Sequence, residues 1–458
     1  MAYTDFIAAI DLGTSHMVGM VGTKNATGAL SIIAYEVENS GTCIRRGCVY
    51  NIDETAMRIK RLVNKLENKL NGTKIGKVYV GLAGQSLCSI EHSVSKLLGV
   101  SGVVTDELLD SLRQECCKYQ SDDMRDVLVA VSPVYFLDNK QVANPVGLSC
   151  SRIEARYRLI VGRPSLKRNL IYSVERAKLE IAGLIVSSLA LADSVLTDTD
   201  KAKGCALIEF GAGVTTLVVY KEGKLLGLSV VPFGGNVITK DIESLGLSTQ
   251  EAERLKQTYG SAVTDRTNDH VQITSSIGFG AAVTQKELNN VVEARTKEIV
   301  ENVFACLERM VQTAGMLGAG VVIAGGGANL QRLPDLIKEI FKLEVRYASV
   351  SRNSVESGDL VTNDSLFAVA LSILMKGEVN CAVTPEPVFV PEQPDQVEEK
   401  SETSVVTPEP EVKEPQAKTS IGKDTRKGGT KSREDSFWDK LRRKRENLMG
   451  GLFDEENI

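Results

Sequence analysis

The sequence predicts an α/β protein built from two duplicated halves, and three observations support this prediction. Short apolar strands and amphipathic helices alternate along most of the 458 residues. A strand, a glycine turn and a second strand occur twice, at AIDLG (9–13) and at LIEFG (207–211), 198 residues apart. A third glycine stretch, AGGGAN (324–329), also follows an apolar strand. Two such hairpins, one in each half, indicate a duplicated architecture with a ligand bound between the halves.

The first half begins with the hairpin FIAAIDLGTSHMVGMVGT. Apolar positions at helical spacing predict a helix over 53–70, and KVYVGLAG (77–84) predicts a strand. Residues 85–160 mix one helix near 105–118 with strands at 127–137 and 152–161, which indicates a small α+β insert. Helical spacing over 165–184 then returns the chain to the larger domain.

The second half repeats the strand, turn and strand pattern from Gly204 onward. Helical patterns cover 248–258 and 285–315, and the segment 320–330 predicts a strand that leads into a helix over LPDLIKEIF. Ordered patterning fades after about Gly377. Seven of the 12 prolines then fall between Pro385 and Pro415 in acidic surroundings, which predicts a disordered linker over 378–435.

The composition excludes several classes of function. A formal net charge of −5 provides no global positive field for nucleic acid. Nine cysteines without CxxC pairing, beside three histidines, suggest neither a zinc site nor a disulfide framework. Asp5 and Asp11 interrupt the N-terminal apolar run, so no secretory signal is expected, and no apolar run reaches the length of about 18 residues that spans a bilayer.

The segment SFWDKLRRKRENLMGGLF (436–453) predicts an amphipathic membrane-targeting helix. Its large apolar side chains fall within an arc of roughly 160°, opposite a basic face suited to anionic lipid. The alternative is a helix that packs on its own domain or on a partner. The expected membrane-binding residues are Phe437, Trp438, Lys440, Leu441, Arg442, Arg443, Leu448, Met449, Leu452 and Phe453.

The glycine turns have a chemical meaning beyond the fold. Glycine lets backbone N–H groups approach phosphate oxygens, and a neighbouring carboxylate can hold a hydrated Mg²⁺ that bridges them. A dinucleotide site at Gly211–Gly213 is disfavoured, because the following VTTLVVY is strand-like where that motif requires a helix. No GxxxxGK[ST] occurs, which excludes a P-loop. Three such loops could enclose one nucleotide.

In this order the three loops resemble the two phosphate motifs and the adenosine motif of the actin-like ATPase superfamily. Within this superfamily, the chain resembles the FtsA family of actin-like bacterial cell division proteins. Three features carry this narrower resemblance: NPVGLSC (144–150), VPFGGNVITKDI (231–242) and the linker with its amphipathic tail. The resemblance implies ATP and Mg²⁺ as ligands, with Asp11 and Glu209 near the metal through water. It implies a nucleotide site formed by Asp11, Gly13, Thr14, Ser15, His16, Gly211, Ala212, Gly213, Val214, Gly235, Asn236, Gly325, Gly326, Gly327 and Ala328.

The second phosphate loop departs from the superfamily pattern. It reads EFGAGV, with Glu209 as the acid, Ala212 in place of a glycine and Val214 in place of a threonine, and position 16 is His where many members place Lys. Loss of the threonine hydroxyl removes a possible metal ligand. Glu209 is the candidate catalytic residue of this loop, and nucleotide binding is expected in preference to fast hydrolysis.

The resemblance also implies an organisation and a set of partners. The expected divisions are subdomain 1A (1–83 and 163–197), an inserted subdomain 1C (84–162), 2A (198–242 and 317–377), 2B (243–316), the linker (378–435) and the tail helix (436–453). Members polymerise head to tail through 1C, bind the C-terminal peptide of FtsZ through 2B, recruit later division proteins, and lie on the cytoplasmic membrane at the septum. A sugar or acetate kinase and a pilus-assembly ATPase are the alternatives in the same superfamily.

Overall fold

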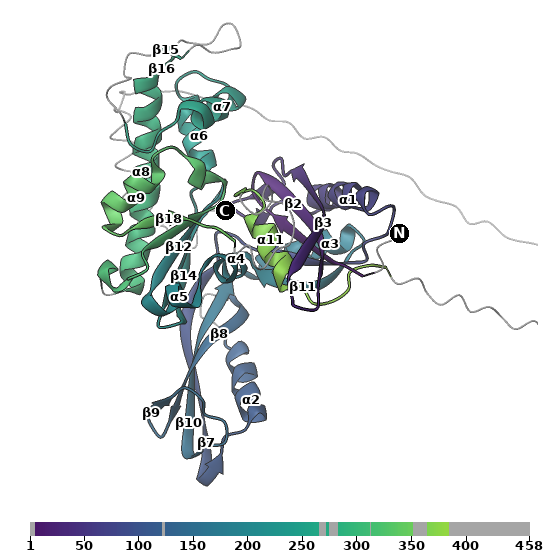
Figure 1. The fold of residues 1–458 in the computed structure, drawn as a ribbon, viewed down its shortest axis with the longest axis vertical. Helices are drawn as coiled ribbons and strands as arrows, with labels where there is room; N and C mark the ends of the chain where they lie inside the picture. The colour runs from purple at the N-terminus through teal and green to yellow at the C-terminus, as the bar shows by residue number, and fades with distance from the viewer. Residues whose placement is uncertain are drawn as a thin grey trace, which may run out of the picture. The chain divides into compact units, whose positions relative to one another are not determined.

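Two β-sheets with matching strand order form the core of this computed structural model (Figure 1). The structure describes residues 5–120, 124–264, 272–273, 283–311, 313–350 and 364–383. The first sheet has the order β11-β6-β1-β2-β3. Its strands are β1 (Ile7–Leu12), β2 (His16–Lys24), β3 (Leu30–Asn39), β6 (Lys77–Leu82) and β11 (Glu180–Val186).

The second sheet repeats this topology in its first five strands, β18-β17-β12-β13-β14. In each sheet a three-stranded antiparallel meander is followed by two parallel strands. The strands are β12 (Cys205–Phe210), β13 (Thr215–Lys221), β14 (Lys224–Val231), β17 (Val321–Ala324) and β18 (Val345–Tyr347). The duplicated α/β fold predicted from the two hairpins is thus confirmed.

Helices cover both sheets and fill the space between them. The helix α1 (Ile52–Lys69) packs on β2 and β3, and α8 (Gln285–Met310) packs on β13 and β14. Between the sheets, α4 (Ser187–Val195) contacts β11 and β13, while α11 (Ala368–Lys376) contacts α4 and β1. The remaining helices are α2 (Asp106–Cys117), α3 (Pro164–Arg176), α5 (Asp198–Lys203), α6 (Gly235–Glu243), α7 (Thr249–Tyr259), α9 (Leu333–Phe341) and the short 3-10 turns η2 (Ala314–Met316) and η3 (Gly326–Asn329).

Local sequence signals account for where the longest helices begin. Asn51 caps α1 by accepting a hydrogen bond from the backbone N–H of Glu54. A capping box between Thr284 and Glu287 starts α8. The predicted face of α1, with Ile59, Leu62 and Leu66, is buried against the first sheet.

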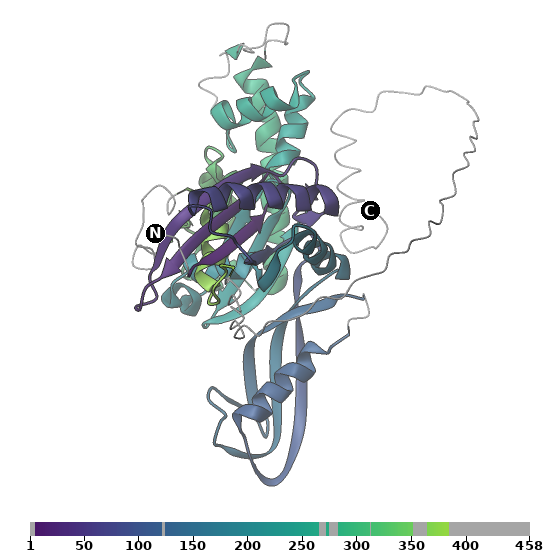
Figure 2. The ribbon, with the colours of Figure 1, turned by 90° about the vertical axis from the view of Figure 1, so that its right-hand side faces the viewer.

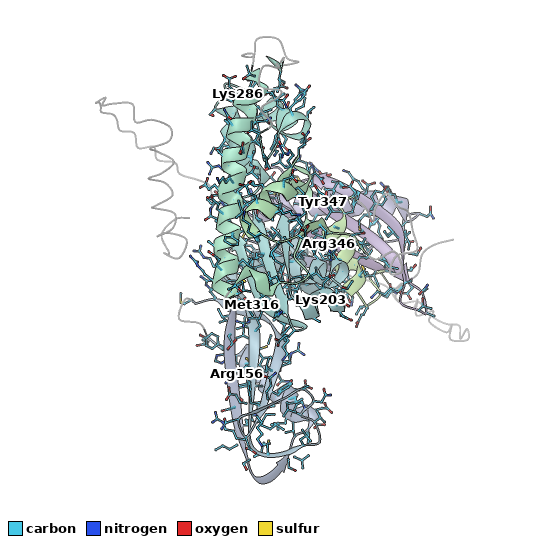
Figure 3. All side chains as sticks on the ribbon, turned by 60° about the vertical axis from the view of Figure 1, so that its left-hand side comes forward. Arg156, Lys203, Lys286, Met316, Arg346 and Tyr347 are labelled. Atoms are coloured by element: carbon cyan, nitrogen blue, oxygen red, sulfur yellow. The ribbon has the colours of Figure 1, made fainter. Side chains whose placement is uncertain are left out.

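The insert between the two pieces of the first half has its own core. Its strands β7 (Cys88–Val103), β8 (Asp126–Leu137), β9 (Lys140–Val142) and β10 (Ser149–Gly162) extend the second sheet through the pairing of Cys88 with Ser229. Side chains of α2, including Leu112 and Cys116, pack with the strands in a separate apolar cluster. Figure 2 shows α2 lying along these strands, and Figure 3 shows Arg156 of β10 far from Lys286 at the start of α8.

The structure corrects the predicted helix over 165–184. The helix α3 ends at Arg176, Lys178 adopts a positive φ of 65°, and Glu180–Val186 forms the parallel strand β11 beside β6. Apolar residues keep helical spacing beyond α3, but residues 180–186 form a strand because they pair with β6. Two further boundaries move: the helix predicted to 315 ends at Met310, and the strand predicted to 330 ends at Ala324.

Short elements that the patterns did not predict complete the fold. They include β4 (Ile44–Arg45), β5 (Cys48–Val49), β9, β15 (Gln272–Ile273), β16 (Val283–Thr284) and β18, together with α4, α5, α6 and α11. The longer strands β3 and β7 were not predicted either. Among the described residues no helix is both long and apolar enough to cross a bilayer. The predicted linker from residue 384 and the predicted tail helix over 436–453 lie outside the described residues.

The chain stays packed for six residues beyond Gly377, where we expected the linker to begin. This strap, residues 378–383, crosses the N-terminal ends of the interior strands β1 and β6. Cys381 N–H donates to the carbonyl of Phe6, and Val383 N–H donates to the carbonyl of Lys74. The buried Tyr79 hydroxyl accepts from the N–H groups of Glu378 (3.0 Å) and Val379 (2.9 Å). The strap therefore belongs to the folded first half.

Replacement of Tyr79 by phenylalanine is expected to lower the free energy of unfolding by about 1–2 kcal/mol, because two strap N–H groups lose their acceptor. Chemical denaturation of the full chain measures this change. Tyr50, which is 62% exposed, provides the matched control, and Tyr50→Phe should leave stability nearly unchanged. Equal effects of the two variants would contradict an anchoring role for the Tyr79 hydroxyl.

Candidate functional site

Two carboxylates occupy equivalent places in the two halves. Asp11 is the penultimate residue of β1, and Glu209 is the penultimate residue of β12. Burial raises the pKa of Asp11 to about 7, against the lowering effect of a hydrogen bond with the Leu12 backbone. Burial likewise raises the pKa of Glu209 to about 7, and the negative charge of Asp11 adds to the shift. The two acids thus face the same region, where a cation would relieve the cost of ionising both.

The two predicted phosphate loops are in direct contact. The turn after β12 closes through a hydrogen bond from Gly211 N–H to the Val214 carbonyl (2.9 Å). A Cβ on Gly213 would stand 2.6 Å from Thr14 Oγ1 of the first loop. Only a residue without a side chain permits this approach, so Thr14 and Gly213 bring the duplicated hairpins together.

The start of α6 is bound to the second loop. Gly235 N–H donates to the Gly211 carbonyl (3.0 Å), and Asn236 N–H donates to the Ala212 carbonyl (2.8 Å). A Cβ on Gly234 would lie 2.4 Å from the Gly211 carbonyl oxygen. The structure therefore brings Gly235 and Asn236 together with the second loop.

The third glycine stretch reaches the same place from β17. Gly325 has a φ of 84°, and a Cβ there would lie 2.4 Å from the Phe210 carbonyl oxygen. Gly327 packs against Phe210, whereas Gly326 is exposed with open space around it. Ala328 is buried, so its side chain supports the turn, and Gly326 and Gly327 are the residues able to line a ligand.

Ser15 and His16 are less closely connected than the other predicted residues. Both are exposed, and His16 Nδ1 lies 3.1 Å from Ser15 Oγ. Val214 is half-buried and packs against an apolar cluster to which both halves contribute. Its apolar side chain offers no ligand to a metal.

Two buried hydroxyls lack a hydrogen-bond partner among the residues that the structure describes, and one of them, that of Ser187, lies close enough to Asp11 to fit the hydration shell of a cation. Ser187 and Ser188, at the start of α4, are 1% and 4% exposed, and neither Oγ has a hydrogen-bond partner within the described residues. The point where a Cβ of Gly81 would stand lies 2.5 Å from Ser187 Oγ and 3.2 Å from Asp11 Oδ1. A buried hydroxyl without a partner is costly, and water held between it and a carboxylate would satisfy both. This donor set suits a hydrated Mg²⁺.

Sequence reasoning missed these serines and two further groups near the loops. Lys256 of α7 extends its ammonium to the Gly235 carbonyl (3.1 Å), Thr239 Oγ1 (2.8 Å) and Glu253 Oε2 (2.6 Å). The β4–β5 hairpin reaches the first loop, since Gly47 N–H donates to Thr14 Oγ1 (2.9 Å). Neither contact can be predicted from the neighbouring sequence, because Lys256 resembles any lysine of an amphipathic helix and the β4–β5 turn is only two residues long.

Comparison with known families agrees with this architecture. A family model described as "Cell division protein FtsA" matches residues 206–372, and one described as "SHS2 domain inserted in FTSA" matches residues 84–161. Among solved structures, a chain of the "PilM-PilN type IV pilus biogenesis complex" superposes with a TM-score of 0.53 at 16% identity, covering 81% of this chain and 97% of that one. At that identity the likeness concerns the fold alone.

Relatives identified by sequence are considerably closer. A cell division protein FtsA of Porphyromonas gingivalis is 35% identical over 360 residues, which is 78% of this chain and 74% of the relative. A cell division protein FtsA of Bacillus subtilis is 31% identical over 380 residues, or 81% of this chain and 84% of the relative. Together with the duplicated actin-like fold, these similarities show that the chain belongs to the FtsA family of cell division proteins.

Proposed function

We propose that this protein binds Mg-ATP between its two halves and acts in division mainly as a structural adaptor, with at most slow ATP hydrolysis. The observation that carries the proposal is the meeting of the two hairpins, with Thr14 against Gly213 and two carboxylates of raised pKa beside them. Such an arrangement suits a polyphosphate with its divalent cation.

Each part of the site has a separate task in this proposal. The turns at Gly13–His16 and Gly211–Val214 offer backbone N–H groups to the phosphates, and Gly235 and Asn236 approach from the start of α6. Gly326 and Gly327 line the adenosine. Asp11 and Glu209 hold Mg²⁺ through water, with Ser187 as a further water partner. Bound Mg²⁺ would neutralise phosphate charge.

The apolar Val214 argues for slow chemistry. A hydroxyl at this position could orient water or ligate the metal, and valine does neither. Glu209 is the one acid in the second loop, and we assign it the role of positioning the metal ion in preference to a catalytic role. ATP then serves chiefly to set the conformation of the two halves.

We further propose that the expected subdomain boundaries hold and that copies of the chain assemble head to tail through the insert, 84–162. The region 243–316 would bind the C-terminal peptide of FtsZ, and later division proteins would join this assembly. Support comes from membership of the FtsA family, which includes division proteins of several bacteria.

The segment 436–453 would attach this assembly to the cytoplasmic face of the membrane at the septum. Its basic residues suit an anionic surface, and its apolar residues suit shallow insertion. A single short helix binds reversibly, but many tails on one filament bind together with a much higher effective concentration. The protein would therefore be a peripheral membrane protein when polymerised.

Liposome co-sedimentation tests this proposal. The full chain is expected to pellet with anionic vesicles, more so with Mg-ATP, while a chain ending at Arg433 and the variant Trp438→Glu should stay in the supernatant. Tyr172→Glu, at an exposed aromatic residue outside the tail, is the matched control and should pellet like the unmodified chain. Equal pelleting of the unmodified chain, the truncated chain and Trp438→Glu would contradict the membrane role.

A further inference from the structure

The β4–β5 hairpin carries a basic turn directly onto the two phosphate loops. Its strands pair Ile44 with Val49 and Arg45 with Cys48, so Arg46 and Gly47 form a two-residue turn. Gly47 N–H donates to Thr14 Oγ1 of the first loop (2.9 Å). A Cβ on Gly213 of the second loop would stand 3.0 Å from Arg46 Cα. The turn thus touches both loops at the point where they meet.

Arg46 is an unfavourable choice for this turn on conformational grounds. Its φ is 49° and that of Gly47 is 73°, values typical of a type I′ hairpin turn, whose first position favours asparagine, aspartate or glycine. A long side chain in this left-handed conformation costs free energy. Strain of this kind at a binding site suggests that the side chain has a function there.

The guanidinium of Arg46 is available for such a function. In the described part of the chain it donates to the neutral amide Oε1 of Gln85 (3.2 Å) and pairs with no carboxylate. Its backbone is fixed, because Gln85 N–H donates to the Arg46 carbonyl (3.1 Å). The neighbouring Arg45 is already engaged, with its guanidinium carbon 3.7 Å from the centre of the Tyr50 ring.

The phosphate loops themselves lack a permanent cation. The first reads DLGTSH and the second EFGAGV, so neither contains lysine or arginine, while both contain an acid. A terminal phosphate bound between them would need positive charge besides the metal. An arginine on an exposed turn that contacts both loops can supply it with several N–H donors in a planar fork.

We propose that Arg46 binds the terminal phosphate of the nucleotide and thereby makes the site prefer the triphosphate over the diphosphate. This inference rests on the proposed nucleotide site. Because the same turn holds Thr14 through Gly47, the arginine also couples the presence of that phosphate to the contact between the halves. Arg46 is then a specificity-determining residue, retained despite the strain of the turn.

The test uses the full chain with Arg46→Asn, which suits the turn and removes the charge. Titration calorimetry with ATP and with ADP, each in excess Mg²⁺, should show ATP affinity falling roughly tenfold or more while ADP affinity changes little. The thermal midpoint without nucleotide should stay the same or rise, because asparagine relieves the turn. Arg46→Lys should restore part of the ATP preference.

Arg45→Ala is the matched control, since it removes an equal charge from the same hairpin. It should leave the ratio of ATP to ADP affinity unchanged. Equal ATP affinity of Arg46→Asn and the unmodified chain would overturn the inference, as would an equal loss in Arg45→Ala or equal losses for ATP and ADP. Absence of any nucleotide binding by the unmodified chain would instead reject the proposed nucleotide site itself.

Discussion

Asp11→Asn is expected to stabilise the nucleotide-free protein at pH 8 by about 2–4 kcal/mol and to abolish tight Mg-nucleotide binding. The pKa of Asp11 rises from 3.8 to about 7 on folding, so the folded protein holds a proton that the unfolded chain releases near pH 4. Stability of the unmodified chain therefore falls as pH rises from about 4 through 7. Asparagine does not titrate, so its advantage should be absent near pH 4 and complete above 7.

Thermal unfolding between pH 4 and 8, without and with Mg-ATP, measures both parts of this expectation. Glu339→Gln, an acid-to-amide change on the exposed side of α9, is the control and should show no comparable pH-dependent gain. Ligand stabilisation should be present in the control and lost in Asp11→Asn. A destabilised Asp11→Asn at pH 8, or a difference that does not vary with pH, would mean that burial does not oppose ionisation of Asp11.

Gly234→Ala is expected to destabilise the protein by about 1–3 kcal/mol and to weaken nucleotide binding at least tenfold. The added Cβ would stand 2.4 Å from the Gly211 carbonyl oxygen and 2.7 Å from that of Ala212, and both are backbone atoms that no rotamer change can move away. The second phosphate loop must shift, and with it the acceptors of the Gly235 and Asn236 N–H groups.

Denaturation and calorimetry on the same preparations test the effect of Gly234→Ala. Gly315→Ala is the matched control, because nothing lies within 4 Å of the added Cβ and its φ does not require glycine. The control should retain both stability and affinity. Unchanged nucleotide affinity in Gly234→Ala, despite the displaced loop, would show that the second loop does not contact the nucleotide.

The local sequence was sufficient for elements whose signal lies within a few residues. The apolar runs that end in Asp11 and Glu209 predicted β1 and β12, and the spacing of Ile59, Leu62 and Leu66 predicted α1. The repeat of one hairpin at a fixed separation predicted the duplicated fold. These features depend on strand alternation, helix periodicity and turn glycine, all of which act over short distances.

The same reasoning failed where two conformations were locally acceptable. The segment after α3 keeps apolar residues at helical spacing, yet 180–186 is a strand because β6 offers it a parallel partner. The strap 378–383 follows a loss of patterning, yet it is ordered because Tyr79 and the chain beside Phe6 and Lys74 satisfy its backbone. Partners distant in sequence decided both cases.

The candidate site shows the same division. From the sequence, phosphate and metal binding were expected of the glycine turns and the two acids, because turn glycines admit phosphate to the backbone and because the three loops resemble those of the actin-like superfamily. Only the folded chain places the hydroxyl of Ser187 near Asp11, Lys256 at Gly235 and Arg46 against the two loops. Each of these is an ordinary residue in its own segment. Its role depends on long-range packing that brings separate segments into contact, and local sequence patterns do not encode that packing.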